Sequence, residues 1–256
     1  MKTKLHWLFI ICLAFSVNTL VAQQVENKPQ GPIYVGTSDN VVQVPSIASR
    51  MNSIQPVDLL SGKAEVMQDG RASKYDIVPG KGSKGDDILA KNPHRLEGTI
   101  PMRAPLLVFE TAASNSQPTD PSLAVGPNHV IAVTNTAFRI FDKDGNPLTA
   151  LLPPNPTIFP SGGCCDLTAS YDNAADRFVL SFLGGGAQIA VSNGPDPVND
   201  GWSTYSYGIV NDYQKLSVWR DGYYMTENTG AAQKLHVFDR AAMLNGDATA
   251  DIQSFA

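Results

Sequence analysis

The chain has 256 residues and carries a formal net charge of −5. Nucleic acids and anionic membranes are bound through clustered Lys and Arg, and the densest basic group here, around Lys81, Lys84, Lys91 and Arg95, is diluted by glycine and aspartate. The composition therefore argues against nucleic acid or an anionic membrane surface as a partner.

Residues 1–23 have the pattern of a cleavable secretory signal peptide. Two lysines precede an apolar run over residues 5–17, and small residues follow near Ala22. The run is shorter than the roughly 20 residues that a membrane span needs, and no later segment is long enough, so no transmembrane segment is predicted. Cys12 lacks the small residue expected before a lipidated cysteine. We expect export through the general secretory pathway to the extracellular space or cell surface, which moves the formal charge from −5 to −7 because two lysines are removed.

Residues 24–103 are rich in Gly, Pro, Ser, Asn and Asp and show no sustained apolar periodicity. This composition predicts a low-complexity, mostly extended leader or linker, because such segments bury too little apolar surface to offset the cost of ordering. Three short apolar stretches, at residues 33–35, 40–44 and 57–60, are candidates to dock on the domain that follows.

Residues 104–256 consist of short β-branched and aromatic runs separated by Gly, Asn, Asp and Pro, which predicts an all-β domain of hairpins. The expected strands lie near residues 105–110, 120–128, 129–134, 138–142, 168–172, 177–182, 188–192, 202–207, 216–219, 223–226 and 234–239.

The strand pattern repeats. Three aspartates, Asp120, Asp166 and Asp212, each precede a similar run of strands and are 46 residues apart. A period near 45 residues with about four short strands is typical of a β-propeller blade. A β-sandwich is the alternative, although it gives no reason for one strand order to return at a fixed interval. A closed propeller has at least about four blades. The roughly three repeats here therefore predict an incomplete propeller, which needs missing blades or self-association to close the ring.

The three aspartates are the candidate binding residues, since equivalent positions in a propeller lie around one rim or channel. A ring of carboxylates at Asp120, Asp166 and Asp212 would suit Ca²⁺ or a cationic ligand. The alternative is that each aspartate accepts backbone N–H bonds at a turn that begins a strand. No other cofactor is expected.

Cys164 and Cys165 are the only cysteines left after removal of residues 1–23. They are adjacent, so they are either two packed thiols or a disulfide between neighbouring residues, which an oxidising compartment would permit. A metal site needs further His or Cys ligands, and none lies near them in the sequence.

No catalytic residue is predicted from motifs. Three histidines remain in the mature chain, His94, His129 and His236, and none falls in a nucleophile or zinc-ligand motif. Residues 142–146 are expected to form a hairpin turn and residues 184–186 a flexible connection, because both lack the ligands of a calcium or phosphate loop. The aromatic residues of the later strands would either line a carbohydrate groove or pack between blades.

The repeats resemble a group of secreted, mostly uncharacterised bacterial propeller-like proteins, often with a C-terminal sorting domain that is absent here. The likeness covers roughly residues 105–245 and rests on three stretches, residues 120–129, residues 171–178 with Tyr171-Asp172 and Asp176-Arg177-Phe178, and residues 212–224. The chain departs from the group's pattern at Gln214, where proline is usual, and at residues 165–167. The resemblance implies an extracellular or cell-surface protein.

Together these observations predict a secreted, non-enzymatic binding or structural module with a protein or carbohydrate ligand. The alternative is the N-terminal part of an extracellular carbohydrate-active hydrolase or lyase.

Overall fold

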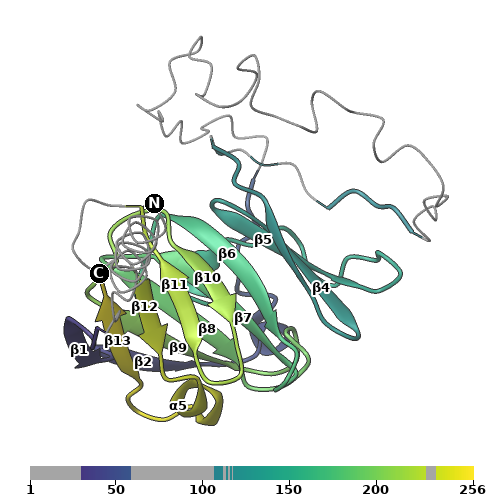
Figure 1. Ribbon diagram of the computed structural model, residues 1–256. Helices are drawn as coiled ribbons and strands as arrows, with labels where there is room; N and C mark the ends of the chain where they lie inside the picture. The colour runs from purple at the N-terminus through teal and green to yellow at the C-terminus, as the bar shows by residue number, and fades with distance from the viewer. Residues whose placement is uncertain (1–29, 59–106, 112–113, 115, 117, 229–234) are drawn as a thin grey trace, which may run out of the picture.

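The computed structural model describes residues 30–58, 107–111, 114, 116, 118–228 and 235–256. Their regular structure is mostly antiparallel β-sheet, in three sheets that lie side by side (Figure 1). The all-β class predicted from the alternating apolar runs is confirmed. The predicted signal peptide and residues 24–29 and 59–103 of the predicted leader lie outside the described residues, as does His94.

The first sheet is a three-stranded meander close to the predicted one. It has the order β3-β4-β5, with bounds β3 (Ser122–Val125), β4 (His129–Thr134) and β5 (Ala137–Asp142). The predicted turn follows β5, where the carboxylate of Asp142 accepts the backbone N–H groups of Asp144 at 2.9 Å and Asn146 at 2.8 Å.

The second and third sheets each have five strands, a four-stranded meander and one additional edge strand. The second has the order β2-β9-β8-β7-β6, with bounds β2 (Asn40–Val44), β6 (Cys165–Asp172), β7 (Arg177–Leu183), β8 (Ala187–Ser192) and β9 (Trp202–Tyr207). The third has the order β1-β13-β12-β11-β10, with bounds β1 (Tyr34–Thr37), β10 (Lys215–Val218), β11 (Tyr223–Thr226), β12 (Leu235–Phe238) and β13 (Asp251–Phe255).

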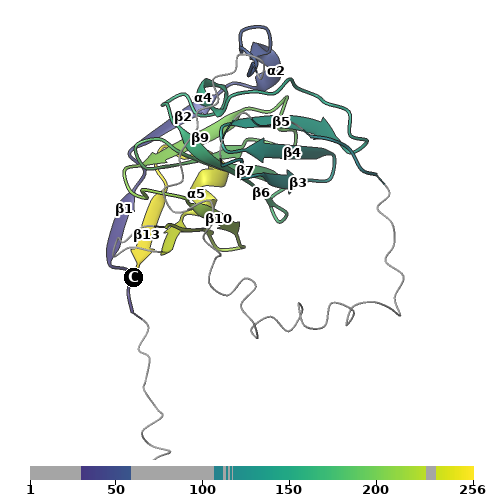
Figure 2. The ribbon, with the colours of Figure 1, turned by 90° about the horizontal axis from the view of Figure 1, so that it is seen from above.

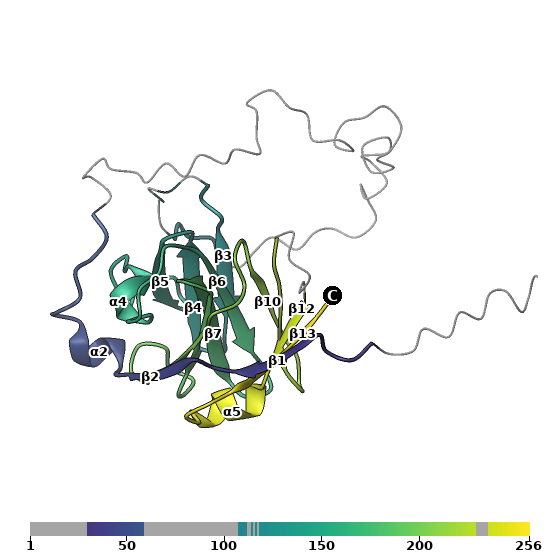
Figure 3. The same cartoon turned by 90° about the vertical axis from the view of Figure 1, so that its left-hand side faces the viewer.

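The two additional strands come from the segment expected to be a leader. β1 pairs with β13 and β2 pairs with β9, both antiparallel, along the far edges of the third and second sheets (Figures 2 and 3). These residues of the predicted leader form strands, and the stretches at 33–35 and 40–44 dock on the domain that follows, as predicted. An unpaired strand edge exposes a row of backbone N–H and C=O groups, and β1 and β2 cover that edge.

Of the strand predicted over residues 105–110, residues 107–110 are described and have no regular structure. The described helices are short: α2 (Ile47–Arg50), α4 (Pro154–Thr157) and α5 (Arg240–Asn245). Within the described part of the chain, none reaches the length and apolar character that crossing a membrane requires.

Two apolar layers hold the sheets together. One lies between the first and second sheets and includes Ile131, Phe178 and Leu180, and the other lies between the second and third sheets and includes Ile189 and Tyr223. Of the aromatic residues considered for a carbohydrate groove, Trp202, Tyr205, Tyr207 and Tyr223 are buried in these layers and form core. Tyr224 is half-buried and Trp219 is exposed.

The first strand of each meander, β3, β6 and β10, is called an inner strand below. β3 contacts β6, and β6 contacts β10, so the three inner strands lie in one row. This row brings together segments 46 residues apart in sequence.

Candidate functional site

A cavity of about 350 Å³ lies where the three inner strands begin, and we call it the inner-strand cavity. Each of the three sheets contributes to its wall, which combines polar and apolar side chains. The lining residues are Asp120, Pro121, Ser122, Asp166, Leu167, Thr168, Ala169, Ser170, Tyr213, Lys215 and Leu216.

The backbone takes the same unusual conformation at the start of each inner strand. Asp120, Asp166 and Tyr213 have φ angles of 40°, 56° and 47°, in the left-handed region. Aspartate enters this region more readily than most residues, because its short polar side chain makes local hydrogen bonds. The spacing of Asp120 and Asp166 therefore reflects a repeated turn, and in the third repeat Tyr213, one residue after Asp212, takes the same position.

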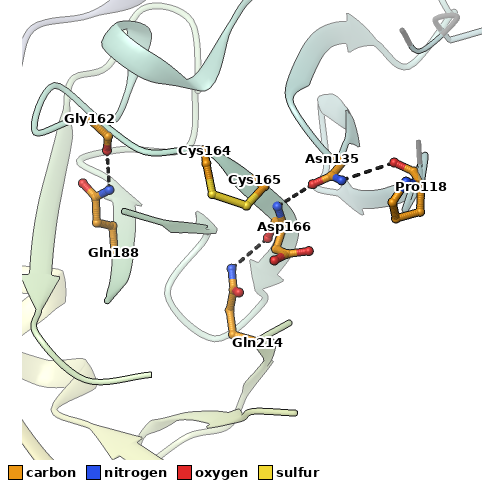
Figure 4. The surroundings of a disulfide bond; sticks show 8 residues. All are labelled: Pro118, Asn135, Gly162, Cys164, Cys165, Asp166, Gln188 and Gln214. Atoms are coloured by element: carbon orange, nitrogen blue, oxygen red, sulfur yellow. Dashed lines mark hydrogen bonds between the residues drawn. A yellow bond between two sulfur atoms is a disulfide. The ribbon is translucent and has the colours of Figure 1, made fainter. Parts of the chain in front are cut away.

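Hydrogen bonds link this end of all three sheets (Figure 4). The Asn135 side chain donates to the Pro118 carbonyl at 3.2 Å and accepts the backbone N–H of Asp166 at 2.5 Å. The Gln214 side chain donates to the Asp166 carbonyl at 2.7 Å and is fully buried. Asp166 is thus held from both neighbouring sheets. A proline at position 214 would lack this side-chain donor.

The Asp166 side chain is buried, and one oxygen of the half-buried Asp120 carboxylate is buried as well. Asp166 is 5% exposed, and burial raises its pKa, with Asp212 and Asp120 adding to the rise. Lys215 and a hydrogen bond from the backbone N–H of Tyr213, in the next repeat, act in the opposite direction. The Oδ2 atom of Asp120 is buried without a hydrogen-bond partner among the described residues. The charges of the three predicted aspartates therefore act on one another, and the hydrogen bond to the Asp166 carboxylate comes from the neighbouring sheet.

Lys215 is the residue of this site that the sequence did not single out. Its Nζ atom donates to the Gln214 carbonyl at 3.2 Å and lies 3.3 Å from the centroid of the Tyr213 ring. Burial lowers the pKa of Lys215, while Asp166, Asp120 and Asp212 raise it. The ammonium group of Lys215 is thus a cation that the carboxylates already face.

Calcium binding at the three aspartates stays a prediction. Among the residues that the structure describes, no group of three or more His, Cys, Asp or Glu side chains is arranged to hold a metal ion. Only Asp120 and Asp166 line the cavity, whereas Asp212 acts on it through its charge.

Cys164 and Cys165 are joined by a disulfide, one of the two alternatives open from the sequence (Figure 4). Cys164 is exposed and Cys165 is buried, and the pair directly precedes Asp166. The backbone N–H of Cys164 donates to the Leu183 carbonyl at 2.9 Å, and the Gln188 side chain donates to the Gly162 carbonyl at 2.6 Å. These contacts fix the segment that leads into the inner-strand cavity.

A Ser-His-Glu arrangement in the third sheet was also missed by sequence motifs. His236 Nδ1 lies 2.8 Å from Ser254 Oγ, and its Nε2 lies 3.2 Å from Glu227 Oε1. A serine nucleophile with a histidine base has this connectivity. Ser254 and His236 are both fully buried, however, so no substrate reaches the hydroxyl. The arrangement is a structural network that satisfies polar groups inside the third sheet.

The buried His236 makes the stability of the fold sensitive to mild acid. Burial lowers its pKa below the ordinary value of 6.5, although Glu227 acts in the opposite direction. As pH falls below 6.5, the unfolded chain takes up a proton at this residue before the folded chain does. The free energy of unfolding therefore falls until pH reaches the folded-state pKa, by up to about 1.4 kcal/mol per pH unit. We expect His236→Gln to flatten this dependence between pH 7 and pH 5 in urea unfolding. His129→Gln is the matched control, and an equal slope in all three proteins would contradict the prediction.

Comparisons with protein-family models, with curated proteins and with solved structures returned no match for this chain.

Proposed function

We propose that the chain is a secreted, non-enzymatic module of the extracellular space or cell surface, built of propeller-like blades, and that it binds a small carbohydrate unit in the inner-strand cavity. The propeller reading is supported by the recurrence of one strand order in three sheets whose first strands lie in a row. The secretory signal pattern supports the location.

The observation that carries the proposal is the chemistry of the cavity wall. Carboxylates of Asp120 and Asp166, the ammonium of Lys215 and hydroxyl groups of Ser122 and Thr168 meet around about 350 Å³. Ligand sites range from about 300 to 1,000 Å³, so this cavity suits a small ligand. A sugar unit carries many hydroxyl groups, each able to donate to a carboxylate and to accept from an ammonium group.

A glycan array followed by isothermal titration calorimetry with the glycans that bind tests this function. We expect Asp166→Asn and Lys215→Met to weaken binding by about 10- to 100-fold, the loss expected for one hydrogen bond to a charged group. Asp144→Asn is the matched control, because it removes one carboxylate from an exposed turn outside the cavity. Absence of any glycan that binds, or equal affinity in all variants, would overturn the proposal.

The second candidate is an extracellular carbohydrate-active hydrolase or lyase. It is favoured by the opposite shifts inside one cavity, a raised pKa at Asp166 and a lowered pKa at Lys215, since active sites often separate the pKa values of acid and base in this way. Release of new reducing ends or unsaturated products from a glycan that binds, abolished in Asp166→Asn, would favour this candidate over the binding module.

A further inference from the structure

The first sheet has an apolar face that nothing described covers at its inner strand. Side chains alternate along a strand, so Ala124 faces the second sheet while Leu123 and Val125 face away from it. Leu123 is 59% exposed and Val125 is 45% exposed. At the far edge of the same face, Phe109 packs on Phe141 with ring centroids 5.2 Å apart, so only the part near β3 stays open.

The equivalent positions in the other two sheets pack against the preceding sheet. The pairing registers define the equivalence: Leu123 pairs with Ala132 in the first sheet, Ala169 with Leu180 in the second, and Leu216 with Met225 in the third. Ala169 is buried, and Leu216 is half-buried against the apolar layer between the second and third sheets. Their pairing partners Leu180 and Met225 are fully buried. The chain therefore contains the same kind of interface twice, and the first sheet presents one side of a third.

The third sheet presents the matching other side. Leu235 pairs with Thr226 on the face that points away from the second sheet, and it is 37% exposed. The equivalent residues Phe138 and Ile189 are almost fully buried, because each packs on the sheet that follows its own. The neighbouring Val237 is half-buried, whereas its equivalents Ile140 and Val191 are buried.

We infer that the open face of the first sheet, at Leu123 and Val125, binds the open face of the third sheet, at Leu235 and Val237, of a second copy of this chain. The occupant is a second copy of this chain, because the third sheet of that copy presents Leu235 and Val237. Within one chain, the equivalent residues of the first and second sheets pack on the sheet that follows them. Each copy offers one face of each kind, so two copies form two equal contacts and close into a dimer, the commonest closed assembly.

The test is the mass of the secreted chain by native mass spectrometry and light scattering. We expect twice the mass of one chain for the unaltered protein, and the mass of one chain for Leu123→Asp and for Leu235→Asp, because an unpaired carboxylate in an apolar contact opposes association. Leu148→Asp is the control, since Leu148 is 39% exposed and lies in the loop after β5. Unchanged circular dichroism and thermal unfolding show that the variants fold.

A mixture of the two variants gives the sharper result. Leu123→Asp keeps an intact third-sheet face and Leu235→Asp keeps an intact first-sheet face, so mixing them restores one contact and a heterodimer. A symmetric contact between two first-sheet faces would give no heterodimer, and would overturn the inference. So would a monomeric unaltered chain, as expected if residues 59–106 cover the face themselves, or open-ended polymers. Glycan binding is measured separately, so a monomer that binds glycans would overturn only this inference.

Discussion

Replacing Asp172 by alanine is expected to lower the free energy of unfolding by about 3 to 5 kcal/mol, the usual cost of removing one partner of a buried ion pair. Asp172 is almost completely buried at the end of β6. It accepts from Arg240 Nε at 2.6 Å, from Arg240 Nη2 at 3.0 Å and from the Tyr223 hydroxyl at 3.0 Å. The substitution leaves the Arg240 charge and the Tyr223 hydroxyl without this partner. Because a domain is stable by only about 5 to 15 kcal/mol, such a loss is a large fraction of the total.

The loss of stability on replacing Asp172 should depend on pH. Burial alone would raise the pKa of Asp172, but the hydrogen bonds from Arg240 and Tyr223 outweigh it, so the pKa lies below its ordinary value. The stabilisation is therefore present above the unfolded-state pKa near 4 and is lost as pH falls through the folded-state pKa. Guanidinium unfolding at pH 7 and pH 3 measures it, and we expect the difference between Asp172→Ala and the unaltered chain to shrink at the lower pH.

Two further variants separate the ion pair from side-chain volume. Arg240→Met combined with Asp172→Ala should cost less than the sum of the two single changes, since neither charge is then left buried alone. Asp142→Ala removes a carboxylate with three hydrogen bonds from an exposed turn and should have a much smaller effect. Equal losses for Asp172→Ala and Asp142→Ala would refute the explanation.

The local parts of the fold were predictable because they depend on neighbouring residues. Alternation within β4, β7 and β8 and the turn at Asp142 gave strands close to those observed. β1 and β2 could not be assigned, because they join their sheets through backbone hydrogen bonds to strands more than 150 residues away. Their sequence shows only short apolar stretches in a polar segment. β13 was not predicted either, because the run at Asp251–Phe255 has few β-branched residues.

The candidate site was predictable only in part. The spacing of Asp120, Asp166 and Asp212 drew attention to the start of the inner strands, where Asp120 and Asp166 line the cavity and Asp212 acts on Asp166 through its charge. Lys215 was hidden by a one-residue insertion in the third repeat: it pairs with Thr226 as Thr168 pairs with Ser181, although it lies 47 residues after Thr168. A fixed period of 46 matches Thr168 to Gln214 instead. Allowing one insertion near Tyr213 would have placed Lys215 among the aspartates.

The contact between Asp172 and Arg240 shows what repeats alone cannot reveal. The two residues are 68 positions apart, and Arg240 begins α5, an element with no counterpart among the predicted strands. The Tyr171-Asp172 and Asp221-Gly222-Tyr223 stretches stood out in the sequence, yet only the packing of the second sheet on the third shows that Asp172 and Tyr223 meet.

Gly186→Ala is expected to destabilise the fold by about 3 kcal/mol or more, because two costs add there. Gly186 has a φ of +131°, a region that residues with a side chain avoid, and a Cβ atom would overlap the Tyr207 carbonyl oxygen, which is backbone and has little room to move. Gly186 directly precedes β8, whose first residue, Ala187, donates its backbone N–H to the Ile209 carbonyl at 2.9 Å. Widening this turn would therefore separate β8 from β9, and the connection at residues 184–186 is constrained at this position.

The adjacent Gly185 gives the matched control for that substitution. Gly185 has a φ of +75°, and no atom lies within 4 Å of the place where its Cβ would be. Gly185→Ala should therefore cost only about 1 to 2 kcal/mol, the usual difference for a left-handed residue with a side chain. Urea unfolding of the two variants side by side measures the contrast. Equal losses would mean that backbone conformation alone sets the cost of both substitutions. A larger loss at Gly186 would show that the close approach of the Tyr207 carbonyl requires a glycine there.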